Sequence, residues 1–171
     1  MPGIDVTPLN QNLRYCEEIY SQYKDVDKQQ LMLKLALLET CGWLEQCLDS
    51  LYNEIAVNDK YQEDKRKRID RIHGFGIDSI QDALIYLIGI VNYSKLEQSL
   101  ERELFENMKS SLGSLKKARD VFAHTSYVSD QSYLGFSQIR KHIDNIIKGL
   151  SQVQSYLIKS KFIPHENKIF L

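Results

Sequence analysis

Hydrophobic residues recur along most of the chain at spacings of three and four, which is the period of an amphipathic helix. The clearest run extends from Leu31 to about Val57. Its apolar positions are Leu31, Leu35, Leu38, Gly42, Trp43, Cys47, Leu48, Leu51 and Ile55. No segment alternates with a period of two for long enough to indicate a strand. The pattern therefore predicts an all-α protein.

Capping and breaking signals divide this pattern into helices. Thr7 and Pro8 resemble a helix start, Asp78 with Gln81 and Ser94 with Glu97 resemble capping boxes, and Pro164 ends the last helix. The expected helices span about 7–23, 27–57, 78–92, 94–122 and 136–157. The polar piece 58–71 is either a helix with little apolar face or a loop. We expect a single domain over residues 1–171, an antiparallel bundle of four to five main helices with 162–171 as a short C-terminal tail.

Composition supports one globular domain. The chain has 171 residues, of which 43% are hydrophobic, so it can bury a core without disulfides. Cys16, Cys41 and Cys47 show no zinc-site spacing and are expected to be small core residues. The longest apolar run is too short for a membrane span, and the first residues do not resemble a secretory signal. The expectation is a cytoplasmic protein with no membrane partner.

Charge is unevenly distributed. The formal net charge is −1, but residues 1–59 carry 4 basic and 10 acidic side chains, whereas residues 109–171 carry 10 basic and 4 acidic ones. Such asymmetry permits a local basic surface for a polyanion such as RNA, although solvated helix faces produce the same pattern. Net charge alone therefore does not exclude a nucleic-acid partner.

The residue arrangement with the most chemical content is Arg119-Asp120-Val121-Phe122-Ala123-His124, where a periodic helix gives way to a polar stretch. An imidazole beside a permanent cation suits phosphodiester cleavage, because His124 can exchange protons while Arg119 holds the phosphate. Five helical residues turn a side chain by about 500°, which leaves the two residues roughly 140° apart. Either the helix distorts or ends between them, or a second subunit completes the site across a two-fold axis. We favour the second option.

This R-x4-H spacing with a polar residue after the arginine, late in an all-helical chain, resembles the HEPN superfamily. The stretch Leu37 to Glu45 is similar to the early helix of its prokaryotic branch that includes the RiboL-PSP type. The resemblance implies a homodimeric bundle and a metal-independent endoribonuclease that needs no cofactor. It also implies that Arg119 stabilises the scissile phosphate, His124 acts as general acid/base, and Asp120 orients a catalytic side chain or the dimer partner.

Other residues complete the expected site or compete with it. The RNA-binding candidates that flank the motif are Lys116, Lys117, Arg140 and Lys141. A second R-x4-H runs from Arg68 to His73, but the apolar Ile69 follows its arginine and it lies early in the chain, so we interpret it as a coincidence. The alternative for the first copy is a solvated Arg119 and a His124 that caps the helix end.

The functional hypothesis is an endoribonuclease of HEPN type, acting as a toxin or as an antiphage or stress-defence effector. Its expected partners are RNA, a second copy of the chain and an antitoxin or another defence protein. The alternative is a catalytically inactive HEPN-like subunit that binds RNA, acts as an antitoxin or serves as a scaffold.

Overall fold

The computed structural model describes residues 6–57, 62–69, 72, 74–124 and 134–164, except the side chains of residues 57, 62, 65, 66, 68, 123 and 124. This part of the chain is mostly helical and contains no strand, which confirms the predicted all-α class. Its helices are α1 (Thr7–Gln22), α2 (Val26–Val57), α3 (Gln62–Ile69), α4 (Ile77–Ile88), α5 (Ile90–Ser99), α6 (Arg102–His124) and α7 (Phe136–Lys159). None of them, as described, combines the length and the apolar character needed to cross a membrane.

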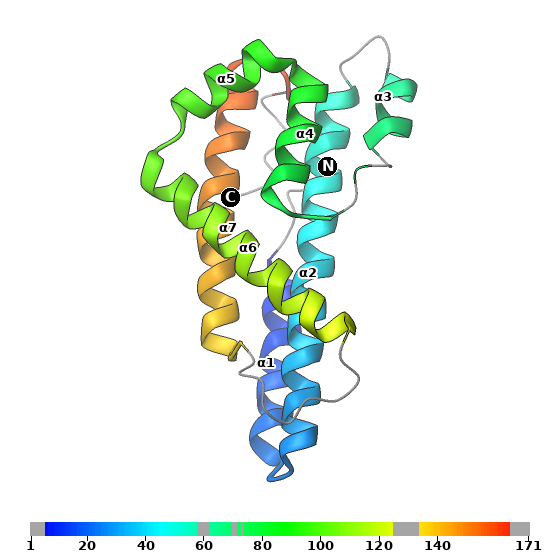
Figure 1. The fold of residues 1–171 in the computed structure, drawn as a ribbon, viewed down its shortest axis with the longest axis vertical. Coiled ribbons are helices and arrows are strands. Elements are labelled where there is room, and N and C mark those ends of the chain that lie inside the picture. Colours follow the sequence, from blue (N-terminus) through cyan, green and yellow to red (C-terminus); the bar gives the residue numbers. More distant parts are fainter. Residues whose placement is uncertain (1–5, 58–61, 70–71, 73, 125–133, 165–171) are drawn as a thin grey trace.

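The long helix α2 runs through most of the molecule (Figure 1). Helix α1 lies antiparallel to its first half, and α3 and α4 flank its second half. Helix α6 crosses α2 and packs most extensively on α7. The chain thus forms a helical bundle in which α6 brings its C-terminal end against the middle of α2.

The core is built from the apolar faces of α2, α6 and α7. Fully buried side chains in these helices include Leu37, Leu44, Leu51, Leu112, Leu115, Ile139, Ile146 and Leu150. Each such side chain contributes about 1.5–3 kcal/mol of transfer free energy when it leaves water. Helices α6 and α7 approach closely at Gly149, where a Cβ atom would lie 2.6 Å from the Cβ and Sδ atoms of Met108. This packing fixes the path of α6 across the bundle.

The chain between residues 77 and 124 forms three helices where the sequence predicts two. Helix α4 ends at Gly89, whose φ of +81° is rarely adopted by other residues, and α5 begins directly after it. The predicted helix 94–122 is broken at Leu100, and Ser94 lies inside α5 instead of at its start. The break is stabilised by α7, because the backbone N–H of Glu101 donates to Gln152 Oε1 at 3.0 Å.

The other boundaries lie close to those predicted, with differences at the helix starts. The polar piece after α2 contains helix α3, which selects the helical alternative for residues 62–69. The N-cap of α4 is Gly76, so the capping box predicted at Asp78 is wrong. Pro164 follows the end of α7 as expected, and the remainder of the predicted tail, 165–171, lies outside the described residues.

The first half of α2 exposes apolar side chains that the pattern predicts as part of a buried face. Leu31, Leu35 and Leu38 are 56%, 40% and 44% exposed. We call these three residues the α2 leucine stripe. At this level of α2 the buried side chains are instead those of Ala36, Leu37, Thr40 and Cys41. The stripe is therefore an apolar surface of the single chain.

Candidate functional site

Arg119 lies near the C-terminal end of α6 and is held by three groups. Its Nη1 atom lies 3.0 Å from Glu45 Oε1 on α2, and its Nη2 and Nε atoms donate to Asp120 Oδ1 at 3.2 and 3.3 Å. The guanidinium carbon stands 4.9 Å from the ring centroid of Phe75. The side chain is 27% exposed. Arg119 is thus partly buried and paired with two carboxylates; the other half of the alternative, a His124 that caps the helix end, concerns a side chain outside the described residues.

The turn Gly74-Phe75-Gly76 supplies the third of these contacts. Gly74 has a φ of +88°, and Phe75 is 1% exposed. Gly76 lies close to α6, because a Cβ atom there would come within 3.2 Å of Lys116 Nζ. The two glycines thus let the turn seat Phe75 against α6, close to Arg119.

His124 is the last residue of α6, and the helix is continuous between Arg119 and His124. The option that the helix ends between them is therefore wrong. In a regular helix the two side chains leave the axis roughly 140° apart. The position of the imidazole itself, and with it the predicted approach to Arg119, lies outside the described residues. Because the helix continues to His124, the option to test is that a second subunit completes the site.

The structure brings some of the RNA-binding candidates together and separates others. Lys116 and Lys117 are exposed on α6 and, with Gly113, Asp120 and Val121, line a surface depression of about 460 Å³.

Arg140 belongs to α7 and pairs with Glu17 of α1, with Nη2 and Oε2 2.7 Å apart. Lys141 beside it is exposed. The C-terminal end of α6 and the first turns of α7 lie on opposite sides of the α1–α2 hairpin (Figure 1). Lys116 and Lys117 therefore lie on the same helix as Arg119, and Arg140 and Lys141 belong to another surface.

The electrostatic surroundings of Arg119 are not strongly positive, because Glu45 and Asp120 both face its guanidinium. The thiol of the neighbouring Cys41 is subject to the same opposing charges. Burial raises the pKa of its thiol to about 12, while Arg119 lowers the pKa and Glu45 and Asp120 raise it. A phosphate group that binds Arg119 would therefore have to compete with Glu45.

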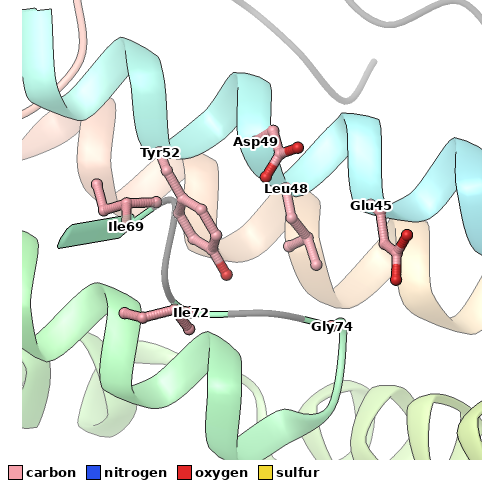
Figure 2. A pocket seen from close by; sticks show the side chains of 7 residues that line it. All are labelled: Glu45, Leu48, Asp49, Tyr52, Ile69, Ile72 and Gly74. Carbon is pink, nitrogen blue, oxygen red and sulfur yellow. The ribbon is translucent and has the colours of Figure 1, made fainter. Parts of the chain in front are cut away.

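A pocket of about 350 Å³ adjoins Glu45 on the side away from the α2 leucine stripe, between α2 and the segment that leads into the turn (Figure 2). Its lining residues are Glu45, Leu48, Asp49, Tyr52, Ile69, Ile72 and Gly74. Sequence reasoning missed this pocket. Glu45, Asp49 and Tyr52 do follow helical spacing on one face of α2, but nothing in the sequence shows which segment covers that face.

Comparison with models of known protein families, with curated proteins and with solved structures finds no match to this chain. The second R-x4-H cannot be compared with the first, because the side chain of Arg68 and all of His73 lie outside the described residues. The geometry around Arg119 is consequently the basis for proposing a function.

Proposed function

We propose that the protein is a metal-independent endoribonuclease of HEPN type that acts as a homodimer, as a toxin or as an antiphage or stress-defence effector. The observation that carries this proposal is the fixed position of Arg119, bound by the adjacent Asp120 on a helix that continues to His124. Asp120 orients the guanidinium, which is the role that the HEPN resemblance implies for it.

In the proposed reaction, the RNA phosphate takes the place of Glu45 on Arg119. An imidazole of His124 removes the proton from the ribose 2′-hydroxyl, whose oxygen then attacks phosphorus. The bond to the 5′-oxygen breaks, and the imidazolium formed at His124 returns a proton to that leaving oxygen. The expected products carry a 2′,3′-cyclic phosphate and a 5′-hydroxyl. Arg119 stabilises the charge that builds up on the phosphate oxygens.

The α2 leucine stripe supports the proposed dimer. Leu31, Leu35 and Leu38 follow spacings of four and three, and Glu45 comes seven residues later, so all four lie on one face of α2. Two turns of helix, about 10.5 Å, separate Leu38 from the residue that holds Arg119. Beyond Leu38, a Cβ atom at Gly42 would meet nothing within 4 Å. A second copy that covers the stripe would therefore come close to Arg119 and complete the site.

RNA cleavage in the presence of EDTA tests this proposal. Purified wild-type protein should cut single-stranded RNA, and His124→Ala should lose at least about a hundredfold in rate, as expected for removal of a general acid/base. His73→Ala, which alters the second R-x4-H, is the matched control and should retain the wild-type rate. If His124→Ala stays folded and dimeric and cuts as fast as the wild type, the role of His124 is refuted.

A second candidate function is RNA binding without cleavage, in an antitoxin or scaffolding subunit. This candidate is favoured because Arg119 is paired with the carboxylates of Glu45 and Asp120 and is poorly available to stabilise a scissile phosphate, whereas Lys116 and Lys117 are exposed and can contact RNA. Binding of RNA that weakens with salt, with no cleavage at any enzyme concentration, would select the binding function.

A further inference from the structure

The pocket beside Glu45 contains a buried polar group that lacks a partner. Tyr52 is 4% exposed, and its hydroxyl makes no hydrogen bond within the described part of the chain. Figure 2 shows this hydroxyl pointing into the space between α2 and the segment with Ile72 and Gly74. Burial, and then the charge of Asp49, raise the pKa of the hydroxyl, so it remains a donor at neutral pH. A buried hydroxyl of this kind is normally satisfied by water or by a ligand.

The rest of the lining indicates the chemistry of such a ligand. Leu48, Ile69 and Ile72 provide apolar walls. Glu45 lies two turns of α2 from Tyr52, about 10.5 Å along the axis, and its carboxylate is on the same side of the helix in Figure 2. Arg119 uses Oε1 of this carboxylate, and Oε2 remains as a further acceptor. Among the described lining residues the charged ones are Glu45 and Asp49, and the guanidinium of Arg119 lies 3.0 Å from Glu45 Oε1. Its volume of about 350 Å³ falls in the range of small-molecule sites.

We propose that this pocket binds a small organic amine, with its ammonium group at Glu45, an apolar body against Leu48 and Ile72, and a hydrogen-bonding group at the hydroxyl of Tyr52. The proposal does not depend on the ribonuclease hypothesis. Three features select this class of ligand: a carboxylate at one end of the pocket, an unpartnered donor at the other, and apolar side chains between them. Trp43 Nε1 and His142 Nδ1 also lack partners in the described part of the chain, but neither residue lines this pocket.

Four small molecules of nearly equal shape test the proposal. Tyramine carries an ammonium group and a phenol, tyrosol replaces the ammonium with a neutral hydroxyl, and p-hydroxyphenylacetate replaces it with a carboxylate. Phenethylamine keeps the ammonium and lacks the phenol. Titrations followed by protein NMR shifts should show that tyramine binds about tenfold more tightly than tyrosol, with still weaker binding of p-hydroxyphenylacetate.

The variant Tyr52→Phe isolates the hydroxyl. It should weaken tyramine binding about fivefold, as expected for one lost hydrogen bond, and leave phenethylamine binding unchanged. Tyr156→Phe is the matched control, because the hydroxyl of Tyr156 donates to the carbonyl oxygen of Asn92 outside this pocket. It should bind tyramine like the wild type.

Any of three results would overturn the proposal. The first is that tyramine does not bind, which would mean that water satisfies Tyr52. The second is that the neutral or anionic analogue binds as well as tyramine. The third is that Tyr52→Phe binds tyramine as tightly as the wild type. All three are read from binding alone, so they are distinguishable from a failure to cleave RNA.

Discussion

Replacing Glu45 with glutamine tests whether Arg119 is available to a phosphate. The change keeps the size of the side chain and removes the charge that lies 3.0 Å from Arg119 Nη1. The two side chains are 27% and 44% exposed, so solvent screens the pair, and its net contribution to folding is about 0.5–1 kcal/mol. Because phosphate and Glu45 compete for one guanidinium, the same free energy should appear as about two- to fivefold tighter RNA binding.

The assay combines RNA titrations at constant salt with urea unfolding of the same protein. Glu106→Gln is a matched control, because Glu106 Oε1 lies 3.2 Å from Lys109 Nζ, a residue outside the predicted site, and the side chains of Lys109 and Glu106 are 38% and 58% exposed. Both variants should lose a similar amount of stability, and Glu45→Gln alone should bind and cleave RNA more strongly. Weaker RNA binding by Glu45→Gln, or tighter binding by Glu106→Gln by the same factor, would refute the competition between Glu45 and phosphate.

Three further predictions concern the dimer, the core and pH. Leu35→Glu should shift the protein to a monomer in analytical ultracentrifugation without lowering its free energy of unfolding, and a persistent dimer would contradict the role of the leucine stripe. Gly149→Ala should destabilise the fold by about 1–3 kcal/mol through its clash with Met108, whereas Gly113→Ala, with open space around it, should stabilise it by up to about 1 kcal/mol in urea unfolding. Burial, and then the charge of Lys141, lower the pKa of His142 below its ordinary value of 6.5, so the unfolded state binds the proton more readily than the folded state. The free energy of unfolding should therefore fall as the pH drops below about 7. Urea unfolding of His142→Gln should show a smaller fall over the same pH range.

The helical class and most helix boundaries follow from local signals that the sequence contains. The period of apolar positions predicts α2 and α7; α7 buries the predicted face, and α2 buries it only beyond Leu38. The break at Leu100 could not be predicted in the same way. It depends on Gln152, which lies 51 residues away from Glu101 along the chain and satisfies its N–H. Tertiary contacts of this kind override a local capping pattern.

The sequence predicts Arg119 and Asp120 as candidate site residues but does not predict which groups contact them. Glu45 and Phe75 reach Arg119 because α6 crosses α2 beside the Gly74–Gly76 turn, and no spacing along the chain encodes that crossing. Arg140 belongs to the helix that follows α6 along the chain, but it lies on a different surface from Arg119. The exposed leucine stripe is predicted as an apolar face but not as a surface, since helical periodicity predicts an apolar face and does not predict whether the same chain covers it.

If Arg119 and His124 of two copies form one ribonuclease site, as we propose, two inactive variants should restore activity to each other when they are mixed. Arg119→Gln and His124→Ala homodimers should each be inactive in EDTA. After mixing under conditions that exchange subunits, the mixed dimer contains one intact Arg119 and one intact His124 on different chains, and RNA cleavage should return. If mixed dimers form and cleavage does not return, while the wild type cuts the same RNA, the shared site is contradicted.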